Sequence, residues 1–227
     1  MTHFTDTAEA VRSAKQTSSN RRSGTSQIYR SVGKRFFDLV VTSAAAIVWL
    51  PVIVLLATLV SLDGHNPFYI QRRVGRDGRV FRMIKLRSMV ADAEAKLARY
   101  LAANPEAKRE WDQNQKLRHD PRITRLGQLL RASSMDELPQ MINVLKGDMS
   151  LVGPRPFMEC QKSLYSGLGY FRVRPGITGL WQVSDRNHSE FAYRAVLDDE
   201  YERNVSFRTD VTILKRTVRA VLACTGY

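Results

Sequence analysis

The longest apolar run in the chain extends from Leu39 to Leu62, where 24 consecutive residues carry no charge. A straight helix of that length reaches about 36 Å, and the hydrocarbon core of a bilayer is roughly 30 Å thick. Pro51 lies near the middle of the run and lacks a backbone donor, which favours a kink or a break at that point. The pattern therefore predicts a membrane helix that is interrupted at Pro51.

Both flanks of this run are basic, with Arg30, Lys34 and Arg35 before it and a cluster of Lys and Arg after it. Because positive flanks favour the cytoplasmic side, both ends are expected on the same face of the membrane. A re-entrant helix–break–helix over residues 30–66 meets this condition, since each arm of about 12 residues would reach roughly 18 Å. A kinked helix that spans the bilayer is the alternative, because prolines do occur in spanning helices.

The rest of the pattern predicts an α-rich fold with short β elements. Residues 68–75 are predicted to form a short strand and turn, and Asp77-Gly78 is a hairpin turn signal. Charged and apolar residues alternate over 79–83, which predicts a second, half-exposed strand. Residues 1–29 are rich in Ser, Thr, Arg and Asn and are expected to form a disordered tail, which leaves 67–227 as the catalytic domain. Helical composition predicts helices over 91–101, 106–117, 125–131, 138–145 and 207–222.

The last of these helices is basic and carries an apolar stripe of Val211, Leu214, Val218 and Leu222. A basic amphipathic helix of this kind is typical of one that lies on a membrane surface. The same periodicity equally fits an ordinary helix that faces a protein core. The sequence leaves both interpretations open.

The net charge of +13 and the pI of about 10.1 call for an anionic partner. Residues 64–90 hold seven basic residues against one acid, and they directly follow the apolar run, so anionic lipid is the first candidate. We recognise no nucleic-acid-binding module and expect no nucleic-acid partner. The two cysteines and four histidines have no zinc-ligand spacing, and a reduced compartment is the simplest interpretation.

Two adjacent acids, Asp136 and Glu137, form the most informative polar motif. Ser134 and Glu137 have the spacing of a capping box, and Pro139 is tolerated in a helix only in its first turn. The acids are therefore expected at a helix N-terminus. Acids at this position commonly do no more than complement the helix dipole, which is the alternative to a chemical role.

The surroundings of the acid pair favour chemistry on a phosphorylated substrate. Arg131 precedes the pair, and Arg155 stands between two prolines that limit its backbone freedom. Guanidinium groups bind phosphate oxygens in pairs of hydrogen bonds. A carboxylate held ionised by arginines could attack phosphorus, and a second carboxylate could hold Mg²⁺.

The chain resembles the bacterial sugar transferase family, the monotopic phosphoglycosyl transferases that begin surface polysaccharide synthesis. The resemblance covers about residues 32–227. It is closest to the galactosyl- and glucosyl-phosphate transferases that initiate exopolysaccharide synthesis, in part because no large N-terminal membrane region is present. The motifs that carry it are Lys85–Met89 (KLRSM), Asp136–Gln140 (DELPQ), Lys146–Pro156 (KGDMSLVGPRP) and Arg174–Val183 (RPGITGLWQV).

The resemblance implies that hexose-1-phosphate passes from a UDP-hexose, galactose or glucose, to undecaprenyl phosphate, with release of UMP. It casts Asp136 as the nucleophile and Glu137 as the ligand of the Mg²⁺ cofactor. It implies substrate contacts for the basic residues Arg131, Arg155, Arg186, Lys85 and Arg87.

It also implies a location at the bacterial inner membrane, with the re-entrant helix in lipid and the catalytic domain on the cytoplasmic face. A homodimer is compatible with it.

Two positions depart from the usual family pattern. Leu86 replaces a commoner Phe, and Asp185 stands where Gly often precedes Arg-Asn, which puts the role of Arg186 in question. The competing hypothesis is a membrane-tethered, inactive adaptor of a polysaccharide synthase. The intact Asp136, Glu137 and Arg155 argue against an adaptor, and the release of UMP would exclude it.

Overall fold

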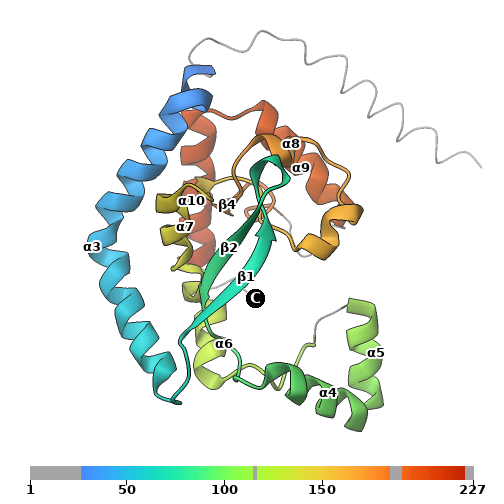
Figure 1. Ribbon diagram of the computed structural model, residues 1–227. Coiled ribbons are helices and arrows are strands. Elements are labelled where there is room, and N and C mark those ends of the chain that lie inside the picture. Colours follow the sequence, from blue (N-terminus) through green and yellow to red (C-terminus); the bar gives the residue numbers. More distant parts are fainter. Residues whose placement is uncertain (1–26, 115–116, 185–190, 223–227) are drawn as a thin grey trace, which may run out of the picture.

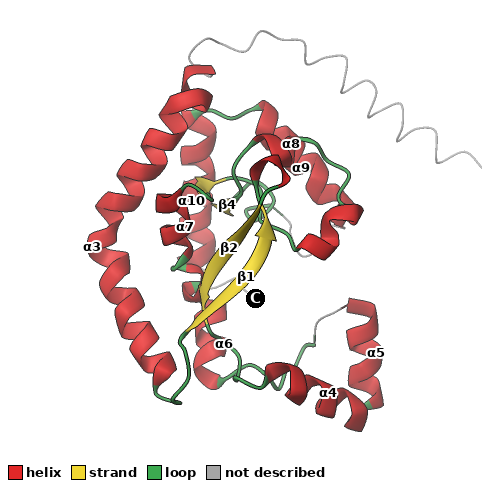
Figure 2. Ribbon diagram, viewed as in Figure 1, coloured by secondary structure: helices red, strands yellow, loops and turns green. Residues whose placement is uncertain are grey.

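The computed structural model describes residues 27–114, 117–184 and 191–222. In this part of the chain helices predominate and the strands are short, as the sequence predicts (Figures 1 and 2). The disordered tail expected over 1–29 lies outside the described residues except for residues 27–29, which are helical and lead into a short π-helical turn, η1 (Tyr29–Gly33).

The apolar run forms one continuous helix, α3 (Lys34–Ser61), with Pro51 inside it. The interruption predicted at Pro51 is therefore a bend rather than a break, and Figure 1 shows α3 curving along one side of the molecule. By length and composition, Tyr29–Ser61 could cross a membrane, and most of this apolar stretch is not buried in the protein. Side chains such as Ile47, Val48 and Leu55 are well exposed.

Polar contacts anchor the N-terminal end of α3 to the rest of the protein. The ammonium group of Lys34 lies 2.7 Å from the Asp210 carboxylate, which is fully buried. Arg35 donates to the carbonyls of Val144 and Leu145 at 2.6 and 3.0 Å, near the end of α7 (Gln140–Lys146). Two of the cations that flank the apolar run thus stabilise the fold through internal contacts.

The predicted hairpin is present. Strands β1 (Phe68–Val74) and β2 (Val80–Leu86) pair antiparallel, from Phe68↔Leu86 to Val74↔Val80, and η2 (Arg76–Gly78) makes the turn. Asn143 of α7 holds β2 in place: its side-chain oxygen accepts from the Ile84 amide, and its amide group donates to the Arg82 carbonyl. This contact fixes β2 against the segment that carries the acid pair.

A second, parallel pair of strands closes the core between α7 and α10. Strands β3 (Ser150–Val152) and β4 (Gly176–Thr178) are in register at Ser150↔Gly176 and Val152↔Thr178. A Cβ at Gly176 would lie 2.1 Å from the Gly153 amide, so this close approach requires glycine. The main buried apolar cluster surrounds these strands and comprises Met83, Val144, Met149, Leu151, Val152, Val173, Tyr201, Val205 and Ile213.

The final helix, α10 (Phe207–Leu222), combines features of both interpretations left open above. Its first half packs into the core through Asp210, Ile213 and Leu214, whereas Val218 further along is exposed. The predicted stripe left out Ile213, which is 2% exposed and belongs to the main buried cluster. The exposed end with Val218 and Arg219 is the part still available to a membrane surface.

The remaining helices frame these layers. Helices α4 (Ala93–Ala103) and α5 (Pro105–Asn114) extend beyond α6 (Arg125–Ala132), at the end of the molecule opposite α8 (Gly169–Arg172) and α9 (Phe191–Arg203) (Figure 1). A turn of 3-10 helix, η4 (Glu159–Leu164), follows the Gly-Pro-Arg-Pro segment. The observed bounds of α4 to α7 differ from the predicted ranges by at most three residues.

Candidate functional site

The acid pair lies on a short 3-10 turn, η3 (Met135–Glu137), between α6 and α7. The predicted capping box is wrong: Ser134 adopts φ +57°, its side chain caps nothing, and α7 begins only at Gln140. The left-handed Ser134 ends the run of α6 and turns the chain, so that the acids point toward β2 rather than complement a long helix. Asp136 is 9% exposed, and acids are seldom this buried unless a cation lies nearby.

Glu137 is held by two cations. Its Oε1 atom accepts from the Lys85 ammonium at 2.7 Å and from the Arg155 guanidinium at 3.0 Å. Burial alone would raise the pKa of this carboxyl, but Arg155 and Lys85 outweigh burial and lower the pKa to about 2. Glu137 is therefore ionised at neutral pH.

Asp136 lies beside the same lysine, with its Oδ2 atom 3.9 Å from the Lys85 nitrogen. Burial raises the pKa of Asp136 above its ordinary value, and Glu137 adds to this, although Lys85, Arg131 and Arg155 act in the opposite direction. The sequence led us to expect arginines to keep this acid fully ionised, and the direction of the shift is the reverse. The two adjacent acids thus have different environments, as a division of roles requires.

A small, solvent-open pocket adjoins the pair on the side of Glu137. Its lining includes the predicted residues Lys85, Glu137 and Arg155, and it adds Arg73 and Gln140, which the sequence analysis did not select. Three cations and one ionised carboxylate give this pocket an excess of positive charge. A phosphorylated ligand is the natural complement of such a site.

Arg73 is the principal residue that the sequence analysis missed. Its guanidinium donates to Gln71 Oε1 at 2.6 and 3.2 Å and to the Pro156 carbonyl at 3.3 Å. Burial and the nearby Arg155 lower its pKa to about 10. Successive residues of a strand face opposite sides, so Arg72 and Arg73 lie on different faces of β1. The sequence showed that the two arginines would face opposite ways, but it did not show which of them would face the pocket.

The other predicted site residues are Arg131, Arg87 and Arg186, and each has a different relation to the pocket. Arg131 donates to Ser88 at 2.8 Å and contributes to the electrostatic environment of Asp136. Arg87 is turned away, toward the segment that follows α3. Arg186 and the neighbouring Asp185 lie outside the described residues.

The two acids could bind magnesium only together with ligands from the substrate and water. Among the described residues, no group of three or more His, Cys, Asp or Glu side chains converges on one point. Mg²⁺ is commonly bound by one or two carboxylates plus substrate phosphates and water, so Glu137, with Asp136 beside it, is a sufficient protein contribution. Lys85 and Arg155 both bind the Oε1 atom of Glu137, so Oε2 is the oxygen that would hold a metal ion.

The family model for bacterial sugar transferases matches residues 29–224, which includes the acid pair, the pocket and α3. The chain belongs to the bacterial sugar transferase family. The match extends through all four motifs on which the resemblance rested, and it therefore confirms the family expected from the sequence.

Curated members of this family are similar over most of the chain. A UDP-galactose-lipid carrier transferase of Erwinia amylovora is 47% identical over 85% of this chain, and an undecaprenyl-phosphate galactose phosphotransferase of Salmonella typhimurium is 43% identical over 85%. The exopolysaccharide production protein ExoY of Rhizobium meliloti is 40% identical over 86%. The chain spans 41% of the length of the first two relatives and 88% of ExoY.

Proposed function

We propose that this protein transfers hexose-1-phosphate from a UDP-hexose to undecaprenyl phosphate, giving undecaprenyl-diphospho-hexose and UMP. The observation that carries the proposal is the acid pair, Asp136 and Glu137, beside a pocket lined by Lys85, Arg155 and Arg73. Relatives whose names describe this class of transfer support it. The product would begin the membrane stage of exopolysaccharide synthesis.

The transfer takes two displacements at one phosphorus atom. A carboxylate oxygen of Asp136 attacks the sugar-bearing phosphorus of the UDP-hexose, the bond from that phosphorus to the bridging oxygen breaks, and UMP leaves with the electron pair. A phosphate oxygen of undecaprenyl phosphate then attacks the same phosphorus. The bond to Asp136 breaks and the free carboxylate is restored, so no proton, oxidant or further reactant is consumed.

The basic residues of the pocket bind and orient the diphosphate. Arg155 and Arg73 both line the pocket, and each guanidinium group is placed by its own contacts with the fold. Lys85 lies within ion-pair distance of both acids. Its positive charge offsets the negative charge that builds up as a phosphate approaches Asp136. Glu137 would hold Mg²⁺, which neutralises charge on the diphosphate and its leaving group.

The arrangement also has to bring a lipid phosphate to a polar pocket. The exposed apolar surface of α3 is suited to lipid, because a soluble protein rarely exposes so continuous an apolar helix. The proposed arrangement is a re-entrant α3 that is bent at Pro51, with the pocket at the cytoplasmic face of the bacterial inner membrane. Undecaprenyl phosphate would then reach the pocket from the bilayer while UDP-hexose arrives from water.

Nucleotide product analysis tests this reaction. The purified protein in nanodiscs, with Mg²⁺ and undecaprenyl phosphate, is given UDP-galactose and UDP-glucose in separate reactions. We expect lipid-dependent release of UMP, with UDP-galactose as the first donor to test because the two relatives above are named for galactose. Release of UDP would mean ordinary glycosyl transfer, and no product from any donor would favour the adaptor.

A further inference from the structure

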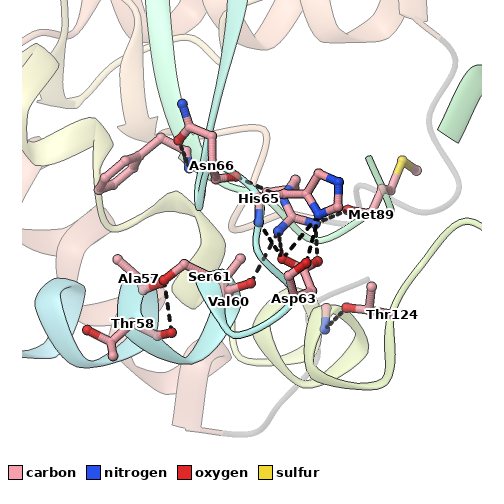
Figure 3. A network of polar contacts seen from close by, with 12 residues as sticks. Ala57, Thr58, Val60, Ser61, Asp63, His65, Asn66, Met89 and Thr124 are labelled. Carbon is pink, nitrogen blue, oxygen red and sulfur yellow. Dashed lines mark hydrogen bonds and ion pairs between the residues drawn. The ribbon is translucent and has the colours of Figure 1, made fainter. Parts of the chain in front are cut away.

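Arg87 connects the end of α3 to the end of β2. Figure 3 shows the residues around this contact, among them Val60, Asp63, Asn66 and Met89. Its two terminal nitrogens bind the two carboxylate oxygens of Asp63 at 2.8 and 2.6 Å. The same guanidinium donates to the carbonyls of Val60, Asn66 and Met89 at 3.1, 2.8 and 3.2 Å. These contacts reach the last turn of α3, the segment that follows it and the residues after β2.

The guanidinium group has no donor left for a substrate. An arginine side chain offers five N–H groups, and each of the contacts above takes one of them. The side chain is 11% exposed, whereas that of Asp63 is 45% exposed. The contacts therefore assign Arg87 to holding protein segments together rather than to binding the phosphate of the acceptor.

The neighbours of Arg87 along the chain each hold part of the site. Lys85 binds Glu137 at 2.7 Å, and the Ser88 hydroxyl accepts from Arg131 at 2.8 Å. Leu86 is buried in a cluster with Val60 of α3 and Leu130 of α6. A shift of this segment would therefore move Lys85 and Arg131 relative to the acid pair.

We propose that Arg87 is a positioning residue, which clasps the end of α3 to β2 through Asp63 and thereby fixes Lys85 and Arg131 around Asp136. This role rests on the proposed phosphoglycosyl transfer. It links the placement of the membrane helix to the geometry of the pocket. It also explains why arginine is needed here, since lysine has three donors on one nitrogen and cannot bind a carboxylate and three separate carbonyls at once.

Steady-state kinetics with Arg87→Lys, Asp63→Asn and the double variant tests the proposal. We expect kcat to fall between about tenfold and a hundredfold in each single variant, because misplacement of about 1 Å can cost that much. KM values for UDP-hexose and undecaprenyl phosphate should stay within about twofold of wild type, since Arg87 has no donor left with which to contact either substrate. The double variant should be no slower than the slower single variant, because both changes open the same clasp.

Arg72→Lys is the matched control. Arg72 also binds a carboxylate through two nitrogens, that of Glu159 at 2.7 and 3.3 Å, but its side chain is 70% exposed and lies on the outer face of β1. We expect this variant to turn over like wild type. A higher KM for undecaprenyl phosphate in Arg87→Lys, with Asp63→Asn unchanged, would overturn the proposal and assign Arg87 to the acceptor.

Hydrogen–deuterium exchange gives a readout that does not depend on turnover. In nanodiscs, peptides covering residues 60–67 should exchange faster in Arg87→Lys and Asp63→Asn than in wild type and Arg72→Lys. Unchanged exchange together with unchanged kcat would refute the clasp. A wild-type protein that releases no UMP would instead refute the proposed function, while the exchange result would still report on the contact itself. Asp63→Asn keeps the test decisive if Arg87→Lys fails to fold.

Discussion

At the residue scale, the proposed chemistry depends on two adjacent acids with different environments. The charges of Lys85 and Arg155 hold Glu137 ionised, with a pKa of about 2. Burial raises the pKa of Asp136, so its carboxylate is less stabilised than that of its neighbour. A nucleophile that is ionised but poorly stabilised is more reactive than one locked in an ion pair, which suits attack on phosphorus.

The pH dependence follows from the environment of Asp136. Because activity needs the carboxylate, kcat/KM should fall as the pH drops through the raised pKa of Asp136. Lys85→Met removes the largest influence that lowers this pKa, so the acid limb of the profile should move to higher pH. The measurement is the pH dependence of lipid-dependent UMP release. Lys162→Met, at an exposed lysine, is the control, and an acid limb that does not move would contradict this account.

Arg73 and Arg72 form a natural comparison, because they are adjacent arginines on opposite faces of β1. Arg73→Ala should raise KM for UDP-hexose by about 10- to 100-fold, since a hydrogen bond to a charged group contributes roughly 1.5–3 kcal/mol. Arg72→Ala should leave KM within about twofold of wild type, as expected for an exposed ion pair. Equal effects of the two substitutions would show that Arg73 acts through general charge rather than through contact with the substrate.

At the scale of elements, the bend of α3 decides how the protein meets the membrane. Proline in a helix removes one hydrogen bond and clashes with the preceding turn, so a bend at Pro51 follows from local chemistry. Both ends of α3 are tied to the catalytic domain, by Lys34 to Asp210 and by Arg87 to Asp63. A bent helix with both ends tied in this way is suited to enter and leave by one face.

Topology can be measured by thiol labelling of single cysteines placed at Ile28 and His65, with Cys160 and Cys224 replaced by Ser. We expect both sites to be labelled from the cytoplasmic side alone. Pro51→Leu restores the missing donor and should let some molecules insert α3 straight, so that its two ends are labelled from opposite sides. Val54→Leu, at an exposed position one turn away, should behave like wild type. Labelling of the unmodified helix ends from opposite sides would establish the spanning alternative.

Local patterns predicted those features that depend on local chemistry. The Asp77-Gly78 turn correctly predicted the hairpin. The uncharged run correctly predicted a long apolar helix with Pro51 inside it. The predicted capping box is absent because Ser134 adopts a left-handed backbone in the turn after α6. It therefore does not cap α7, which begins only at Gln140. The inward face of β1 could not be predicted either, because it depends on which surface packs on the Gly-Pro-Arg-Pro segment.

At the scale of the whole molecule, the positive charge and the exposed apolar surface of α3 both fit the proposed function at a membrane. The basic residues are divided between internal anchors, such as Lys34 and Arg87, and the pocket cations Lys85, Arg155 and Arg73. These residues account for part of the net charge of +13. This charge suits the proposed function, in which an anionic donor and an anionic lipid phosphate meet at the same buried carboxylate.

Isotope exchange without the lipid acceptor tests the central claim most directly. Labelled UMP is incubated with unlabelled UDP-hexose, Mg²⁺ and lipid-depleted protein, and incorporation of label into UDP-hexose is measured. If Asp136 forms a covalent phospho-sugar intermediate, the first displacement is reversible on its own and label should appear in UDP-hexose, as in ping-pong kinetics. Asp136→Asn should abolish this exchange, while the exposed-site control Glu159→Gln should not. Lipid-dependent release of UMP without any exchange in the absence of lipid would contradict the covalent mechanism.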